Sequence, residues 1–338
     1  MADAGISRAQ HTKGLASFAK FGQTWIMQLR VRSITYLAEA INGCELIDPR
    51  GRDLPRFAAG AHIDLRFGDL VRQYSLCNDT AERRRYCIAV LLEEESRGGS
   101  RYLHEALRVR DLVEVSMPRN NFPLDEEAKR HLLIAGGIGI APIMSMVAEL
   151  RRRHADFQLH YCARSAVRTA FREDLGPLAG GGRVHFHYDG GDPARGLDIT
   201  ATLRDPPAGT HLYYCGPAGL MAAAAEAAKA WPAGTVHCEY FMAPPAASVV
   251  EDKPFRVRLA RRGVEYEIPV GETIVRVLRR HGITVPTSCE LGYCGACVTR
   301  YLEGEPDHRD QVLREYGRGR FVLICCARSK TPVLHLDL

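Results

Sequence analysis

The sequence predicts a multidomain protein in which a small antiparallel β-barrel precedes a doubly wound α/β domain and a third domain with a cysteine loop. Three observations support this prediction. Short alternating segments fill the first third of the chain, strands and helices alternate in the middle, and closely spaced cysteines stand near the end. A length of 338 residues also exceeds what one ordinary hydrophobic core supports.

The first segments, in an expected domain at 22–125, alternate between apolar and polar residues. Trp25, Met27, Leu29 and Val31 alternate, with Gln28, Arg30 and Arg32 after the last three of them, which is the period of a half-buried strand. The segments HIDLRF, RQYSLCN, YCIAVLL and DLVEVSMP follow, with turn residues between them. Several short strands at this spacing predict a small antiparallel barrel.

The pattern changes in the expected second domain, at 126–242. HLLIAGGIGIAPIMSMVAELRRR combines an apolar strand, a glycine turn and an amphipathic helix. FQLHYCARS, VHFHY and HLYYCGPAGLMAAAAEAAKA continue the alternation, and TVHCEYF adds a last strand. Strands alternating with helices predict a parallel sheet with helices on both faces.

A glycine turn in this second domain suits a phosphate group. Gly136, Gly137 and Gly139 connect a strand to a helix that begins near Pro142. Such glycines let a pyrophosphate approach the helix N-terminus, and proline suits a first helical turn. The pattern is G-x-G-x-x-P and not the G-x-G-x-x-G of classical dinucleotide folds, so by itself it also fits a simple tight turn.

A second turn strengthens this interpretation. In YCGPAGLM, the residues Cys215, Gly216 and Pro217 follow a later strand. They are expected at the carboxyl edge of the sheet, where open α/β sheets bind their ligands.

The third expected domain covers 253–338, after a linker at 243–252 that contains APPAAS and is rich in Pro and Ala. PFRVRLARRGVEYEI predicts a hairpin that turns at Arg262-Gly263, and TIVRVLRR predicts one helix with a buried face. A hairpin, a helix and then a cysteine loop is the order of a β-grasp ferredoxin.

The cysteine loop predicts a metal cluster. Cys289, Cys294 and Cys297 are spaced C-x4-C-x2-C and a distant thiol follows, which is the ligand spacing of a plant-type [2Fe-2S] cluster. Four thiolates satisfy two irons bridged by sulfide. A structural zinc site is the alternative, but it usually uses C-x2-C pairs and only one such pair is present.

Two neighbouring cysteines compete for the fourth ligand position, Cys325 and Cys326. Plant-type ferredoxins end this site with a lone cysteine after an apolar run that resembles FVLIC here. The resemblance implies Cys325 as the ligand and Cys326 as a packed neighbour.

Composition restricts the environment and the partners. The chain is 46% hydrophobic and 25% charged, as in soluble globular proteins. It has no apolar stretch of about 20 residues and no secretory signal, so we expect a cytoplasmic protein with no membrane association. Residues 253–338 hold 15 Lys and Arg against 10 Asp and Glu, an excess that fits either an acidic docking partner or an ordinary solvated face. No nucleic-acid-binding motif is present.

Two features of the barrel resemble the flavin domain of the ferredoxin reductase superfamily. One is the strand RQYSLCN, and the other is a Gly-Gly-Ser turn that opens a predicted helix and offers free N–H groups to an anion. In that superfamily such a strand lies along the isoalloxazine ring and such a turn holds the phosphate. The resemblance implies these flavin-binding residues: Arg72, Gln73, Tyr74, Ser75, Ala89, Val90, Gly98, Gly99 and Ser100.

The same resemblance assigns roles around a nicotinamide. It places Ser75 near flavin N5 and Cys215 beside the nicotinamide ring, and it lets Glu239 and Phe241 close the site near the flavin. Arg164 in CARSAVR is implied as a nucleotide contact. Because Arg164 and its neighbours Ser165 and Arg168 could also hold a 2′-phosphate, NADPH stays an alternative to NADH.

The order of the three domains resembles the phthalate dioxygenase reductase family, and so do the phrases PRNNFPL, GGIGIAP, YCGPAGLM and LEGEPDHRD. The resemblance implies that NADH gives a hydride to FMN and that a [2Fe-2S] cluster passes single electrons to a partner. The implied partner is a Rieske-type oxygenase or demethylase that acts on aromatic compounds. A reductase for a cytochrome P450, or a flavin reductase with a redox-sensing or zinc-stabilised C-terminal module, stays open.

Overall fold

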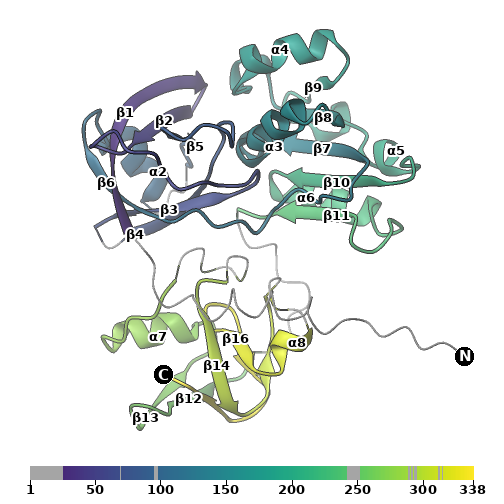
Figure 1. Ribbon diagram of the computed structural model, residues 1–338. Coiled ribbons are helices and arrows are strands. Elements are labelled where there is room, and N and C mark those ends of the chain that lie inside the picture. The colour runs from purple at the N-terminus through teal and green to yellow at the C-terminus, as the bar shows by residue number, and fades with distance from the viewer. Residues whose placement is uncertain are drawn as a thin grey trace, which may run out of the picture. The chain divides into compact units, whose positions relative to one another are not determined.

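The computed structural model describes residues 26–68, 70–94, 98–241, 252–287, 290, 292, 295–310, 313 and 315–338. Contacts divide them into two compact units, one formed by Met27–Asp252 and the other essentially by Lys253–Leu338 (Figure 1). Residues 22–25 of the expected first domain and 243–251 of the expected linker lie outside the described residues. The bounds of the three expected domains and of the linker stay predictions.

The first unit begins with a six-stranded sheet in the order β4-β3-β6-β1-β2-β5. Its two ends meet in an antiparallel bridge between Leu76 and Ile88, where the Cys77 N–H donates to the Cys87 carbonyl at 2.9 Å. The sheet is therefore closed into a barrel. Its strands are β1 (Ile26–Ala38), β2 (Ile41–Ile47), β3 (His62–Phe67), β4 (Leu70–Ser75), β5 (Tyr86–Leu91) and β6 (Leu112–Ser116).

The predicted alternation explains the barrel core. Leu29 and Val31 of β1 are buried while the arginines beside them are exposed, and Ile63 and Leu65 of β3 are buried in the same core. After β5, the short helix α2 (Gly99–Arg101) continues into a π-helical turn, η1 (Tyr102–Ala106). The ring of Tyr102 stacks on Phe67 at 4.7 Å between centroids, which fixes the turn against the barrel.

A five-stranded parallel sheet follows, in the order β11-β10-β7-β8-β9. From β7 the sheet extends through β8 to β9 on one side, and from β10 to β11 on the other. This is the strand order of one half of a classical dinucleotide-binding fold, and its switch point lies between the first and fourth strands, β7 and β10. The strands are β7 (Arg130–Gly136), β8 (Asp156–Ala163), β9 (Val184–Tyr188), β10 (Thr210–Cys215) and β11 (Val236–Glu239).

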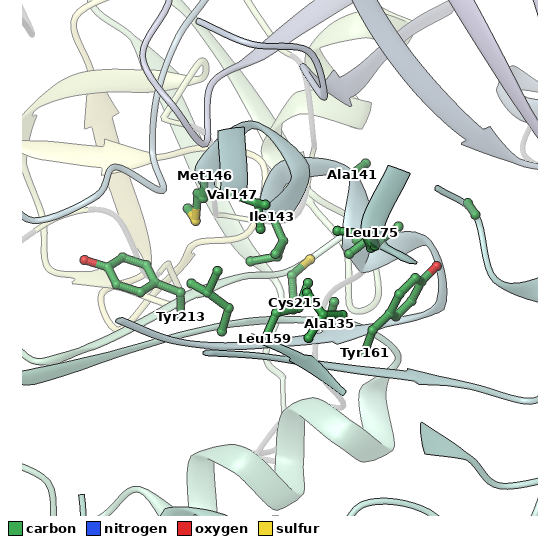
Figure 2. Close-up of a cluster of buried hydrophobic side chains, with 14 of the residues drawn as sticks. Ala135, Ala141, Ile143, Met146, Val147, Leu159, Tyr161, Leu175, Tyr213 and Cys215 are labelled. Atoms are coloured by element: carbon green, nitrogen blue, oxygen red, sulfur yellow. The ribbon is translucent and has the colours of Figure 1, made fainter. Parts of the chain in front are cut away.

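Helices cover both faces of this sheet because successive side chains of a strand point to opposite sides. Leu133 and Ala135 pack under α3 (Ile140–Arg152) and α4 (Arg172–Gly180), as Figure 2 shows for the cluster around Cys215. Leu132 and Ile134 pack on the other face against α5 (Ile199–Leu203) and α6 (Ala218–Ala227). Three 3₁₀ turns complete this part: η2 (Gly137–Gly139), η3 (Ala166–Arg168) and η4 (Pro193–Arg195).

The barrel and the parallel sheet share a hydrophobic core. Ala59 and Phe122 from the barrel side belong to the same buried cluster as α3 and β7. Polar contacts reinforce this packing, because Ser145 Oγ of α3 accepts the Gly60 N–H at 3.0 Å. The two expected domains therefore form a single packed unit.

The second unit is a five-stranded mixed sheet in the order β13-β12-β18-β14-β16, with α7 (Ile274–Arg280) packed on it. The Thr273 hydroxyl caps α7 by accepting the Arg276 N–H at 3.2 Å. The predicted hairpin and helix are thus present, and the predicted fold class is confirmed. The remaining bounds are β12 (Phe255–Leu259), β13 (Val264–Ile268), β14 (Val298–Glu303), β15 (Pro306–Asp307), α8 (Glu315–Arg318), β16 (Phe321–Leu323), β17 (Arg328–Ser329) and β18 (Val333–Leu336).

None of the described helices combines the length and the apolar composition that crossing a membrane requires.

Candidate active site and cluster site

The two predicted nucleotide turns meet at the carboxyl ends of β7 and β10. A Cβ atom on Gly139 would stand 2.2 Å from the Cys215 carbonyl oxygen, so only glycine allows the turns to approach this closely. Helix α3 begins at Ile140, with Pro142 in its first turn. Open α/β sheets bind nucleotides at such a switch point, here called the nucleotide crevice, and the backbone N–H groups at the start of α3 suit a pyrophosphate.

Arg164 stands at the same edge of the sheet. It follows the last residue of β8, the strand beside β7, and its side chain is exposed. Of its two predicted companions, Arg168 is engaged elsewhere, because its guanidinium pairs with Glu39 Oε1 at 2.6 Å. Arg164 makes no ion pair within the described part of the chain, which leaves its guanidinium available to a nucleotide.

Three of the four residues predicted around hydride transfer lie together. Ser75 Oγ, at the end of barrel strand β4, donates to Glu239 Oε2 of β11 at 3.2 Å. Cys215 is the register partner of Glu239 on the neighbouring strand. Phe241 follows two residues after Glu239 with 38% of its surface exposed, and its place beside a flavin stays a prediction.

Burial determines the protonation states of Glu239 and Cys215. It raises the pKa of the Glu239 carboxyl to about 7, although the hydrogen bond from Ser75 acts in the opposite direction. Burial, and then the neighbouring Glu239, raise the pKa of the Cys215 thiol well above its usual value. Cys215 therefore stays a neutral thiol at physiological pH and contributes shape and packing.

The sequence analysis missed His62, which lies opposite Ser75 on β3 and has its Nδ1 3.8 Å from Glu239 Oε1. Its side chain is buried, and both ring nitrogens are without a hydrogen bond among the described residues. Burial, and then the nearby Arg119, lower the pKa of His62 to about 4, so the imidazole is neutral. Nothing in the local sequence marks this histidine, because its importance comes from strand register.

The flavin-binding features also come together. A Cβ atom on Gly99 would stand 2.6 Å from Arg72 Cγ, so the Gly98–Ser100 turn lies directly against strand β4. The Nε2 atom of Gln73 is buried and has no partner among the described residues, as expected for a donor that a ligand satisfies. A flavin with its phosphate at the turn and its ring along β4 fits this arrangement.

The turn is also tied to β5, which carries Ala89 and Val90. His104 of η1 contacts the Val90 carbonyl through Nε2 at 2.9 Å. The Val90 side chain packs in the barrel core, whereas Ala89 packs in the core shared with the parallel sheet. Contacts of β5 with a flavin would therefore come from Ala89 and from the backbone.

Two of the four predicted cluster ligands are described, and they lie together. Cys297 and Cys325 are both buried, and hydrogen bonding with Cys297 and then Cys326 lowers the pKa of the Cys325 thiol to about 4. Cys289 and Cys294 lie outside the described residues. Gly292 has a φ of +82°, and a Cβ there would stand 2.8 Å from Cys326 Sγ, so this point of the chain lies directly against Cys326, the neighbour of Cys325. Paired buried thiols of this kind suit an iron–sulfur cluster.

The fold and these sites define a class of protein, the reductases that join a flavin barrel and a nicotinamide-binding sheet to an iron–sulfur domain. The model of the family described as "2Fe-2S iron-sulfur cluster binding domain" matches residues 257–330, which favours a [2Fe-2S] cluster over zinc. The chain is 48% identical over 335 residues to the tert-butanol monooxygenase / tert-amyl alcohol desaturase reductase subunit of Aquincola tertiaricarbonis, covering 96% of this chain and 99% of that protein.

Solved structures agree. One is phthalate dioxygenase reductase, described as a modular structure for electron transfer from pyridine nucleotides to [2Fe-2S]. Its sequence is 42% identical to this one, the match covers 93% of this chain and 98% of that chain, and the TM-score is 0.72. An intact type IV self-sufficient cytochrome P450 monooxygenase is 37% identical over 93% of this chain but only 41% of its own, with a TM-score of 0.80. The chain belongs to the phthalate dioxygenase reductase family. It is an oxidoreductase with the family's cofactors, FMN, NADH and a [2Fe-2S] cluster, and its partner is an oxygenase component.

We predict that Gly139→Ala weakens NADH binding. The added methyl group must displace the Cys215 carbonyl, and overpacking of this kind costs about 1–3 kcal/mol. If this cost falls on the nucleotide-bound state, the Kd for NADH should rise by about 5- to 150-fold. Stopped-flow measurement of flavin reduction against NADH concentration tests this. Gly219→Ala in α6 is the matched control, since no atom lies within 4 Å of its added methyl group; equal effects of the two substitutions would contradict the prediction.

A second prediction concerns pH. The Glu239 pKa rises from 4.5 to about 7 on folding, so the folded state binds more protons than the unfolded state between these values. Its contribution to stability is complete below pH 4.5 and is lost as pH rises to about 7. Between pH 5 and pH 8, the free energy of unfolding of the wild type should therefore fall by on the order of 2 kcal/mol relative to that of Glu239→Gln. Urea denaturation of both proteins at several pH values measures this, and parallel curves would refute it.

Proposed function

We propose that this reductase delivers its electrons to a Rieske-type oxygenase or demethylase. The named relatives support an oxygenase partner, because one is a monooxygenase reductase subunit and another is phthalate dioxygenase reductase. The observation that carries the reductase chemistry is the hydrogen bond between Ser75 and Glu239, which joins the barrel strand expected along the flavin to the sheet that forms the nucleotide crevice. The cytoplasmic location stays a prediction.

The proposed site residues act by placement. FMN, when bound, accepts a hydride and releases electrons singly, which a [2Fe-2S] cluster requires. Gly136, Gly137 and Gly139 would hold the pyrophosphate of NADH, and the Cys215 thiol would pack beside its nicotinamide. Ser75 Oγ donates to Glu239 Oε2 and thereby holds the carboxyl group between the barrel strand that would bind the flavin and the sheet that would bind the nicotinamide.

The basic residues of α7 suit an acidic docking partner. Arg276, Arg279 and Arg280 line one surface of the second unit together with Glu272. Arg279 reaches the cysteine loop, since its Nη2 donates to Thr287 Oγ1 at 3.1 Å and also pairs with Glu290. Arg276 is exposed and makes no ion pair among the described residues. An acidic patch on the oxygenase that meets this face would come close to the cluster.

A cytochrome P450 partner is the second candidate. It is supported by the resemblance to the self-sufficient P450, in which a region like this chain forms less than half of the protein. The chain spans nearly the full length of the oxygenase reductases it matches, and this favours a separate oxygenase component.

Reconstitution separates these partners. Anaerobic NADH titration of the purified protein, followed by visible absorption and EPR, should reduce both the flavin and the cluster. The reduced protein should then reduce a purified Rieske oxygenase, such as the oxygenase component of a phthalate dioxygenase, much faster than it reduces a bacterial P450 under the same conditions. Faster reduction of the P450 would reject the Rieske assignment, whereas flavin reduction with no cluster signal would reject the electron path itself.

We predict that Arg276→Glu slows electron delivery to the oxygenase at low salt. The substitution reverses one charge on the proposed docking face, so association should slow by about 10-fold at low ionic strength and much less at high ionic strength. Reduction of the flavin by NADH should be unchanged. Arg262→Glu, in the exposed turn between β12 and β13, is the control with the same charge change. A similar slowing in both variants would argue against docking through α7.

A further inference from the structure

Three side chains toward the amino end of the parallel sheet converge on one point, at the opposite ends of the strands from the nucleotide crevice. Asp125, His211 and His237 each place a ligand atom within 4.8 Å of the other two. The segment that enters β7 contributes the aspartate, and β10 and β11 contribute the histidines. This is the one such group of three among the residues that the structure describes.

Strand geometry brings the two histidines together. Tyr213 of β10 is the register partner of His237 of β11, and His211 precedes Tyr213 by two residues on the same face. The ring of His237 stacks on Tyr213 with centroids 4.5 Å apart, which fixes the orientation of the imidazole. The backbone of Asp125 is also held in place, because its N–H donates to the Tyr213 hydroxyl at 2.8 Å. Tyr213 thus contacts both the His237 ring and the backbone of Asp125, while His211 stacks on His237 with centroids 5.3 Å apart.

The distances match metal coordination. His211 Nδ1 and His237 Nε2 are 3.1 Å apart. Two nitrogens bound to one tetrahedral Zn²⁺ at about 2.0–2.1 Å each are separated by about 3.3 Å. Two imidazoles and one carboxylate form a ligand set that zinc uses, with water in the fourth position. The three residues are partly exposed, so ion and water can enter.

The carboxylate of the group is also oriented by its surroundings. Asp125 Oδ1 already accepts the Glu127 N–H at 2.8 Å, which orients the carboxylate. A hydrogen bond between the two imidazoles would also give a 3.1 Å separation, and the approach of the Asp125 carboxylate to both rings is the additional feature that a metal site requires.

We propose that Asp125, His211 and His237 form a binding site for one divalent transition-metal ion, with Zn²⁺ as the best-matched ion. The bound ion would join β11 to β10 and to the segment that enters β7. Since His237 precedes Glu239 by two residues on the same strand and the same face, the ion would also fix the strand that carries Glu239.

Equilibrium dialysis of the holoenzyme against buffered Zn²⁺ tests the proposal, with zinc and iron counted in the same samples. The wild type should bind one Zn²⁺ per chain without loss of iron. His237→Ala and Asp125→Asn should each bind it at least about 10-fold more weakly, because even outer-sphere changes weaken metal sites by that factor. Asp125→Asn keeps the shape of the side chain and the hydrogen bond from the Glu127 N–H. Weaker zinc binding by this variant would therefore result from the lost carboxylate ligand and not from misfolding.

His187→Ala is the matched control. His187 and His160 form an equally close imidazole pair, 3.0 Å apart, in the same sheet but without a third ligand in the group. This variant should bind zinc like the wild type. No zinc in the wild type, or equal affinity in all four proteins, would overturn the proposal; equal affinity with loss of iron would assign the zinc to the cysteine loop.

Discussion

The contact between Ser75 and Glu239 is the interaction on which the proposed chemistry depends. It joins residues 164 positions apart, one at the end of a barrel strand and one at the end of the edge strand of the parallel sheet. Such a contact requires that the barrel and the sheet pack as a single body, and the core shared by Phe122, α3 and β7 provides that packing. A flavin and a nicotinamide held by two independent domains would lack this fixed geometry.

Burial gives this contact its chemical character. Glu239 and His62 approach within 3.8 Å, yet burial favours the neutral form of each. His62 is therefore neutral near pH 7 and forms no ion pair with Glu239, whose carboxyl group exchanges its proton around that pH. A hydride acceptor that becomes negatively charged is disfavoured beside a fixed carboxylate. A neutral carboxyl group at this position removes that repulsion and leaves a proton close to the site.

The folds of the three domains could be predicted from the sequence, because each has a periodicity or a residue spacing that lies within a short stretch of the chain. Alternation marks β1 and β3, the glycine turn marks the start of α3, and the cysteine spacing marks the loop that Cys297 closes. Contacts set by register were not accessible. His62 and the group of Asp125, His211 and His237 have their partners on strands distant in the sequence, and no local pattern reports which residues face each other across a sheet.

The position of β11 at the edge of the described sheet has a consequence for how the site can change. An edge strand of four residues has hydrogen-bonded neighbours on one side only, so it is the part of the sheet that opens with the smallest loss of contacts. Glu239 therefore belongs to an element that can detach while β7 and β10 keep the crevice intact. Amide exchange in β11 would then report openings of the hydride-transfer site that leave the rest of the sheet closed.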